Sequence, residues 1–220
     1  MLSDSFNEVL CQIGMPNLKH PIFYNTPVGI RFEIAGDEPV YINDSNNGEN
    51  IANPEYVSAA LNRAKTIYLS LPHQPDILRI DTYPDEEYSQ QKDTLKKLVD
   101  LGIPHPQEQK LVYLRQEDEN DVVIQLQSYW GLEKTFHPEA LLQEIIRSDI
   151  GGNISGLVSN VYFVDSIGSI LFYLYDDRGA DLVATDKELL RPIFEKYNDW
   201  ILDYDRDQII RTFKNEHSLL

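Results

Sequence analysis

The stretch from Asn160 to Ala184 reads NVYFVDSIGSILFYLYDDRGADLVA, and it decides the fold. It contains three runs rich in β-branched and aromatic residues, separated by two short polar segments, Ser166–Gly168 and Asp176–Gly179. Serine, aspartate and glycine are residues that reverse turns favour. The stretch therefore predicts a tight hairpin and then a third strand that turns the sheet once more.

Further strand patterns lie earlier in the chain. Residues 27–36, PVGIRFEIAG, alternate apolar side chains with glycine and charged residues, which predicts a strand with one buried face and one charged face. Other β-rich runs fall at residues 76–83, 111–115 and 121–127. The last two flank the polar residues 116–120 and fit a hairpin.

Helix patterns are marked by their starting residues. Asn53 followed by Pro54 is a strong start signal, because Asn caps a helix and Pro fits its first turn. The capping-box spacing of Ser or Thr with Glu three residues later appears twice, at Ser5 and at Thr185. We expect helices to begin at Ser5, Asn53, Ser89, His137 and Thr185, and Pro192 to kink or restart the last of them.

The order of these elements indicates the fold class. Strands that arrive in clusters are typical of an α+β fold with a mostly antiparallel sheet flanked by helices. A length of 220 residues fits a single compact domain spanning residues 1–220. Residues 43–50 are expected to form a solvated loop, and the glycine-rich residues 151–156 mark the place where two lobes would divide.

The formal net charge of −17 limits the classes of partner. A field of this sign repels phosphate backbones and anionic lipids, and it speeds encounter with basic proteins. We therefore expect neither nucleic acid nor a membrane as partner. The chain's one cysteine, Cys11, allows no intramolecular disulfide, and the first residues lack a signal-peptide pattern, so we expect a cytoplasmic protein. Cys11 itself is interpreted as a packed core residue in an apolar helical stripe.

Three segments carry a resemblance to a known family. They read VGIRFEI at residues 28–34, NPEYVSAALNRAKTIY at 53–68 and LYDDRGADLVATDKELLRPIFEKYNDWILDYDRDQI at 174–209. The chain resembles the bacterial domain of unknown function 3885 over most of its length. The resemblance implies a bacterial cytosolic protein and transfers no reaction, cofactor or catalytic residue.

Two acidic segments, Asp176–Asp181 and Asp203–Asp207, are the candidate site. One interpretation is a charged turn in which Arg178 pairs with the second segment. Another is a convergence of carboxylates that holds a divalent cation or works as acid and base, although Arg178 and Arg206 would compete with such a metal. The candidate residues are Asp176, Asp177, Arg178, Asp181, Trp200, Asp203, Tyr204, Asp205 and Arg206.

The aromatic residues near the C-terminus have two interpretations. Their near-helical spacing is most simply that of core residues, and any that are exposed would be anchors for a protein partner. They are Phe194, Tyr197, Trp200 and Tyr204.

Familiar catalytic motifs are missing from the sequence. The five histidines have no metal-ligand spacing, and no Walker loop, Rossmann fingerprint or GxSxG elbow occurs. We assign no catalytic residue, metal or cofactor, and expect a non-enzymatic protein-binding module of the immunity or antitoxin type, which neutralises a basic toxin or enzyme. The alternatives are an enzyme that uses the two acidic segments and a regulatory domain that binds a small ligand.

Overall fold

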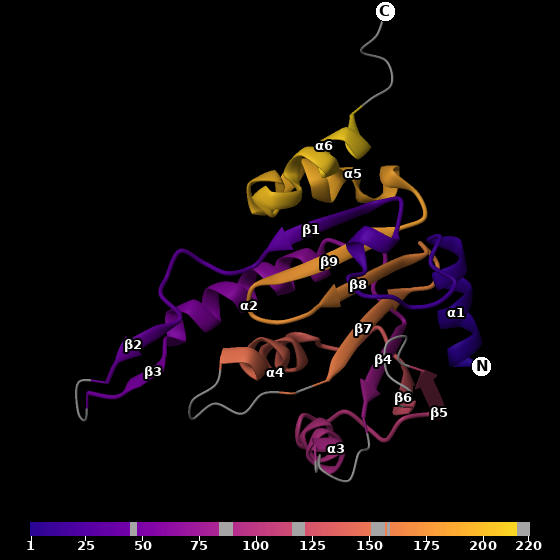
Figure 1. Ribbon diagram of the computed structural model, residues 1–220, viewed down its shortest axis with the longest axis horizontal. Coiled ribbons are helices and arrows are strands. Elements are labelled where there is room, and N and C mark those ends of the chain that lie inside the picture. Colours follow the sequence, from indigo (N-terminus) through magenta and orange to yellow (C-terminus); the bar gives the residue numbers. More distant parts are fainter. Residues whose placement is uncertain (45–47, 84–89, 116–121, 151–156, 158, 215–220) are drawn as a thin grey trace, which may run out of the picture.

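The structure is a computed structural model that describes residues 1–44, 48–83, 90–115, 122–150, 157 and 159–214. Its centre is a seven-stranded sheet in the order β1-β9-β8-β7-β4-β6-β5, in which every neighbouring pair is antiparallel (Figure 1). The strands are β1 (Gly29–Glu33), β4 (Ile77–Thr82), β5 (Glu108–Arg115), β6 (Val122–Gly131), β7 (Asn160–Asp165), β8 (Ile170–Leu174) and β9 (Gly179–Ala184). The expected α+β fold with an antiparallel sheet is confirmed.

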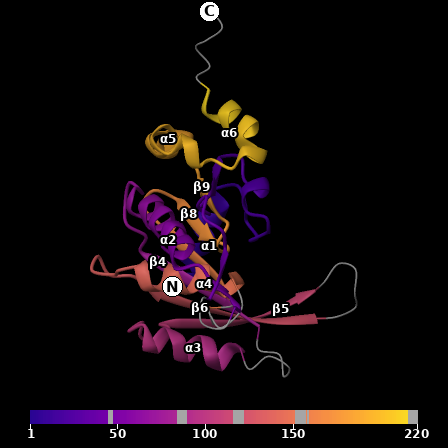
Figure 2. The ribbon, with the colours of Figure 1, turned by 90° about the vertical axis from the view of Figure 1, so that its left-hand side faces the viewer.

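Helices surround this sheet. They are α1 (Leu2–Gln12), α2 (Pro54–Leu69), α3 (Gln90–Asp100), α4 (Glu139–Ile150), α5 (Lys187–Lys196) and α6 (Arg206–Phe213), with three short 3₁₀ turns, η1 (Phe23–Asn25), η2 (Asn198–Trp200) and η3 (Asp203–Asp205). Figure 2 shows α5 and α6 at one end of the molecule and α3 at the other.

Two apolar cores lie on opposite faces of the sheet, because the alternation of side chains along each strand divides them between the faces. The larger core joins strand residues such as Phe32, Phe163 and Phe172 to all helices except α1. The smaller core joins Phe6 and Leu10 of α1 to the other face. The described fold therefore has three layers: α1, the sheet, and the other helices on the opposite face.

The stretch that predicted the fold forms β7, β8 and β9, and its first turn depends on a glycine. Asp165 accepts hydrogen bonds from the backbone amides of Ile167 and Gly168, at 3.0 and 2.9 Å. A Cβ atom at Gly168 would lie 2.5 Å from a carboxylate oxygen of Asp165. This turn therefore has room for no larger residue at that position.

The C-terminal segment covers one edge of the sheet. Ile201 forms a β-bridge with Phe32, and the amide of Leu202 donates to the carbonyl of Arg31 at 2.9 Å. The edge strand β1 is thereby protected from pairing with another chain. The helix expected after Thr185, with a kink or restart at Pro192, is observed as α5, which contains Pro192 and ends at Lys196; η2, η3 and α6 follow it.

Several predicted helix boundaries are confirmed and others are wrong. Asn53 caps α2 by accepting a hydrogen bond from the amide of Glu55 at 3.0 Å, as expected. At α5 the cap is Asp186, which accepts from the amide of Glu188 at 2.9 Å, and not Thr185. Helix α1 begins before Ser5, with Met1 at its N-cap position.

Two further expectations are corrected. Cys11 is exposed, because the apolar stripe of α1 faces the sheet and Cys11 lies on the opposite side of the helix. Within residues 43–50, a small two-stranded sheet of β2 (Tyr41–Asn43) and β3 (Asn50–Ala52) takes the ends of the predicted loop. The possible lobe division at residues 151–156 lies outside the described residues.

Candidate functional site

The predicted site residues fall into three groups, and the first is the β8–β9 turn. Arg178 donates from its Nε and from its backbone amide to the carboxylate of Asp176, at 2.9 and 2.8 Å, and lies 3.4 Å from Asp149 at the end of α4. The expectation that Arg178 pairs with the Asp203–Asp207 segment is therefore wrong. Asp176 lies two residues before Arg178, so its carboxylate pairs with the guanidinium within the turn itself.

Asp177, next to this pair, is held by a tyrosine. The hydroxyl of Tyr56 on α2 donates to Asp177 at 2.6 Å. Burial raises the pKa of Asp177, the Tyr56 bond opposes that rise, and the negative charge of Asp176 adds to it. Oxygens of Asp149, Asp176 and Asp177 lie within 4.8 Å of one another, a grouping that could hold a cation. The guanidinium of Arg178 already contacts two of the three.

The second group is centred on Arg31 of β1. Its guanidinium donates to Asp181 of β9 at 2.7 and 3.1 Å, and its terminal nitrogen lies 3.6 Å from the buried Oδ2 of Asp205. Tyr24 donates to the other oxygen of Asp205 at 2.6 Å, and the amide of Phe23 donates to Asp181 at 3.1 Å. One arginine therefore does join the two acidic segments, but it is Arg31.

Sequence reasoning placed Arg31 on the charged face of a strand and did not assign it to the site. Arg31 lies directly opposite Asp181 in the pairing of β1 with β9. That register depends on two strands 150 residues apart, so strand alternation alone could not reveal it. The alternation did, however, indicate which residues of each strand share a face.

A pocket of about 300 Å³ opens beside this arginine, and its lining combines charged, aromatic and imidazole groups. The residues are His20, Pro21, Arg31, Tyr173, Tyr175 and Asp181. The guanidinium of Arg31 lies over the rings of Tyr24 and Tyr175, at 4.7 and 5.8 Å from their centroids. The pocket therefore brings the Arg31–Asp181 pair and the ring of Tyr175 together around a small cavity.

His20 forms one wall of this pocket. Its Nε2 lies 2.9 Å from the hydroxyl of Tyr162, and its ring is 5.0 Å from that of Tyr173. Although the residue as a whole is exposed, loss of water on the side facing these rings lowers the pKa of His20. The charge of Asp181 opposes this effect, and that of Arg79 reinforces it.

The pocket lies at one end of a polar row that crosses the whole sheet. Consecutive members are direct partners in the strand pairing, one residue from each strand: Arg31, Asp181, Tyr173, Tyr162, Arg79, Tyr129 and Glu108. Arg79 is buried and forms two 2.7 Å hydrogen bonds with Asp81. Such a satisfied network fixes the side chains of the row and holds the pocket wall in place.

The third group lies in the segment between α5 and α6, where Arg206 links η2 to η3. Arg206 donates to Asp203 at 2.8 Å and to the carbonyls of Asn198 and Ile201 at 2.9 and 2.8 Å. Trp200 is half-buried and stacks on Tyr197, with ring centroids 4.9 Å apart. Its interpretation as a core residue is therefore partly confirmed.

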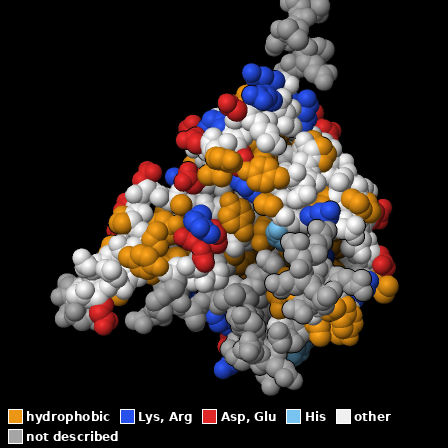
Figure 3. All heavy atoms as spheres, viewed as in Figure 1, with side chains coloured by type: hydrophobic (Ala, Val, Ile, Leu, Met, Phe, Trp, Pro, Cys, Tyr) orange, Lys and Arg blue, Asp and Glu red, His pale blue; other side chains and the backbone are white. Residues whose placement is uncertain are grey.

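Tyr204 differs from the other C-terminal aromatics, because 86% of it is exposed. Its interpretation as a core residue is wrong, since η3 turns it outward between Asp203 and Asp205. Figure 3 shows hydrophobic side chains gathered below α5 and α6, with acidic and basic side chains beside them.

We define the tyrosine–aspartate surface as Tyr24, Asp203, Tyr204, Asp205 and Asp207. Its two arginine neighbours, Arg31 and Arg206, pair with acids of the same region. Counting the four aspartates 181, 203, 205 and 207 against these two arginines leaves a charge of −2. These six residues therefore carry a net negative charge despite their ion pairs, while Arg211, one turn after Asp207 on α6, is outside this count.

Among the described residues, no helix has both the length and the apolar character needed to cross a membrane. No solved structure matches the chain. A segment of 45 residues is 44% identical to the uncharacterized protein YnaE of Bacillus subtilis (strain 168), and it spans 20% of this chain and 21% of that protein. The chain thus spans about a fifth of the length of the curated relative it matches.

A family profile described as "Domain of unknown function (DUF3885)" matches residues 6–205, which include every strand of the sheet and the residues of the Arg31 pocket. The chain therefore belongs to the DUF3885 family.

Proposed function

We propose that this protein is a non-enzymatic binding protein that recognises a basic protein through the tyrosine–aspartate surface. The concrete form of the proposal is an immunity or antitoxin-type protein that acts in the cytoplasm and neutralises a basic toxin or enzyme by direct contact. The observation that carries it is the exposure of Tyr24 and Tyr204 next to a cluster of aspartates that keeps a net negative charge.

The exposed tyrosines supply the first part of the argument. Tyr24 is 46% exposed and Tyr204 is 86% exposed, and both are fixed at their bases by short-range structure in η1 and η3. Tyrosine is enriched among interface residues that contribute most to affinity, because it buries a large ring and keeps a polar tip. An exposed tyrosine is therefore a suitable anchor for a partner.

Charge supplies the second part. The net charge of −17 attracts basic proteins over long range, and the local excess of two negative charges orients them toward this surface. The Arg31 pocket of about 300 Å³ adjoins the surface and gives it a concave feature. Negative charge, exposed tyrosines and a concave pocket therefore occur together at this surface.

The alternative of an enzyme that uses the acidic segments has less geometric support. Asp177 is bonded to Tyr56, Asp181 to Arg31 and Asp205 to Tyr24. Carboxylates that are bonded to neighbouring side chains in this way stabilise the fold, and the two segments meet through Arg31 instead of converging on a shared cleft. In the second segment, Asp203 and Asp207 are exposed, and with Tyr204 they are the groups available to a partner.

The test begins with capture of the bound protein from the native bacterium, followed by its purification and by binding kinetics with the recombinant pair. We expect a basic partner and a one-to-one complex without turnover of either chain. Tyr204→Ala should speed dissociation about tenfold, the effect of losing one strong anchor.

The matched control is Tyr113→Ala, a tyrosine on β5 that is 66% exposed and belongs to the other edge of the sheet. It should leave dissociation unchanged. If the captured partner is acidic, or if Tyr113→Ala weakens the complex while Tyr204→Ala does not, the proposed surface is wrong.

A further inference from the structure

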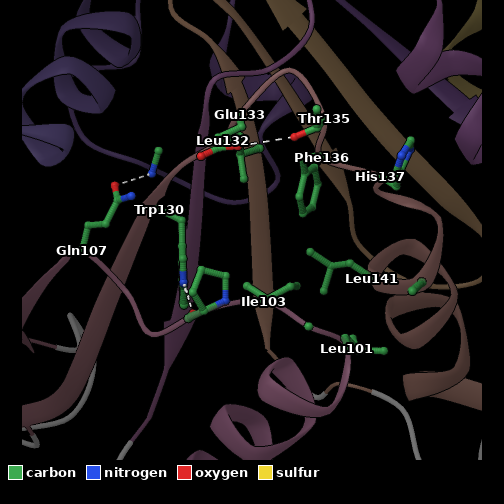
Figure 4. Close-up of a pocket in the computed structure, with 14 residues that line it drawn as sticks. Leu101, Ile103, Gln107, Trp130, Leu132, Glu133, Thr135, Phe136, His137 and Leu141 are labelled. Carbon is green, nitrogen blue, oxygen red and sulfur yellow. Dashed lines mark hydrogen bonds between the residues drawn. The ribbon is translucent and has the colours of Figure 1, made fainter.

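A second pocket lies at the opposite end of the sheet, between the C-terminal end of β6, the turn after α3 and the start of α4 (Figure 4). Its volume is about 470 Å³, within the range of about 300–1,000 Å³ that is typical of small-molecule sites. It shares no lining residue with the Arg31 pocket.

The interior of this pocket is apolar. Trp130, Ile103 and Leu141 are buried and form its inner wall. Leu101, Leu132 and Phe136 are half-buried, and Figure 4 shows their side chains surrounding the same central space. A ligand would therefore place its apolar body against an aromatic ring and several aliphatic groups.

Polar groups of the inner wall are already satisfied within the protein. The indole nitrogen of Trp130 donates to the carbonyl of Pro104 at 2.7 Å, and the amide of Gly131 donates to Gln107 at 2.8 Å. Trp130 consequently offers its ring face and not its N–H group. These bonds also hold the wall in a fixed position, so the pocket is largely formed before a ligand binds.

The polar side chains that could contact a ligand lie at the rim of the pocket. Glu133, Thr135 and His137 lie at the margin of the pocket in Figure 4 and are exposed. The hydroxyl of Thr135 donates to the Glu133 carboxylate at 3.4 Å. Among the described lining residues, Glu133 is the one Asp, Glu, Lys or Arg side chain, so it gives the described part of the rim a fixed negative charge.

From this geometry we infer that the Trp130 pocket binds a small organic ammonium ion, with an aromatic or aliphatic body in the apolar interior and the ammonium group at Glu133. The carboxylate stabilises the positive head, and the net charge of −17 raises the local concentration of cations over anions. The inference is independent of the proposed protein partner, which would bind at the other end of the sheet.

Three probes of similar size and different charge test the inference: 2-phenylethylamine, 2-phenylethanol and 3-phenylpropionate. The chain has two tryptophans, so a Trp200→Phe background leaves Trp130 as the reporter of pocket occupancy by fluorescence. We expect saturable binding of the amine in the millimolar range, as suits a ligand of this size. The amine should bind about two- to fivefold more tightly than the alcohol, and the acid most weakly.

Two variants locate the binding. Glu133→Gln should reduce the affinity of the amine to that of the alcohol, whereas Glu195→Gln, the same change at an exposed position on α5, should have no effect. Ala140→Phe, at an exposed lining position on α4, should fill the pocket and abolish binding of all three probes. Thermal melts of each variant verify folding, and they give a second measure of binding, because a ligand of the folded state raises the melting temperature.

Several results would overturn the inference. One is an absence of any saturable change in Trp130 fluorescence and in melting temperature with the amine. Others are equal affinity for the three probes, or amine binding that persists in Ala140→Phe. A failure here would leave the protein-binding proposal untouched, because the tyrosine–aspartate surface is not altered by these substitutions.

Discussion

Arg31 and Arg178 both lie among carboxylates, yet their surroundings differ in solvent exposure. The side chain of Arg31 is 12% exposed and that of its partner Asp181 is 1% exposed. The side chain of Arg178 is 69% exposed, although it contacts Asp176 and Asp149. Water screens an exposed pair and leaves a buried one strongly coupled, so the two arginines should contribute very differently to stability.

Arg31→Ala should lower the free energy of unfolding by about 3–5 kcal/mol, because it leaves the buried carboxylate of Asp181 without its cation. Arg178→Ala should cost less than about 1 kcal/mol. Urea denaturation of the two variants measures the difference. Equal losses would show that Asp181 is compensated by other groups when Arg31 is removed.

Asp177 predicts a dependence of stability on pH. Its pKa is raised in the folded state by burial, so the folded protein holds this proton more tightly than the unfolded chain does. Its contribution to stability is therefore largest below the ordinary pKa of aspartate and is lost as pH rises through the raised value. Asp177→Asn, which keeps an acceptor for Tyr56, should stabilise the protein at pH 7 and have a shrinking effect as the pH falls toward 4.

Denaturant melts of Asp177→Asn and the parent protein between pH 4 and pH 7 test whether the substitution raises the free energy of unfolding at pH 7. Asp203→Asn, which removes one charge from an exposed position, is the control and should show no comparable trend. Loss of stability at pH 7 in Asp177→Asn would mean that the Tyr56–carboxylate bond outweighs the cost of burying the charge.

At the scale of secondary-structure elements, the sequence predicted most strands and helices because their signals are local. Alternation of apolar residues identified β1, a β-rich run identified β4, and turn residues identified the β7–β8–β9 meander. Strand order and register depend on contacts between distant segments, so the polar row across the sheet and the Arg31–Asp181 pair could not be predicted. The partners of the two acidic segments, Arg31, Tyr24 and Tyr56, come from elsewhere in the chain, so the segments alone did not indicate them.

The start of α5 shows how a local signal can identify the wrong residue. Thr185 and Asp186 both have side chains suited to an N-cap, and Thr185 has the capping-box spacing to Glu188. In the structure Thr185 donates to the carbonyl of Gln12 at 3.2 Å, which orients its hydroxyl toward α1, and Asp186 takes the cap. Tertiary contact with α1 thus decides between two locally acceptable caps.

Asp186→Ala should therefore lower the free energy of unfolding by about 1 kcal/mol, the usual cost of losing an N-cap side chain. Thr185→Ala should cost less, because its bond to Gln12 is solvent-exposed and neutral. Thermal or urea melts of the two single variants give the comparison. A larger loss in Thr185→Ala would show that anchoring α1 matters more than capping α5.

At the scale of the whole molecule, the two proposed binding sites lie at opposite ends of the sheet. The sheet is closed at the β1 edge by the C-terminal segment, in which Tyr204, Asp203 and Asp207 are exposed and Asp205 is buried. The Trp130 pocket lies near the other edge, beneath the turn between α3 and β5. The sheet lies between them and they share no residue, so a substitution in one leaves the residues of the other unchanged.

The proposed binding function predicts a strong effect of salt on association. The field of a protein with a charge of −17 acts on a basic partner before contact, and at physiological ionic strength it is screened over about 8 Å. The association rate should therefore fall steeply as salt rises, while dissociation, which depends on contacts already formed, should change far less. Stopped-flow or surface-binding kinetics over a series of salt concentrations measure both rates.

The double variant Asp203→Asn/Asp207→Asn separates the surface from the net charge. If these acids face the partner, the variant should associate more slowly and with a weaker dependence on salt, whereas Glu55→Gln/Glu195→Gln, which removes two charges elsewhere, should have a smaller effect. Equal slowing in both double variants would mean that the net charge alone steers the partner. It would also remove the reason for placing the interface at the tyrosine–aspartate surface.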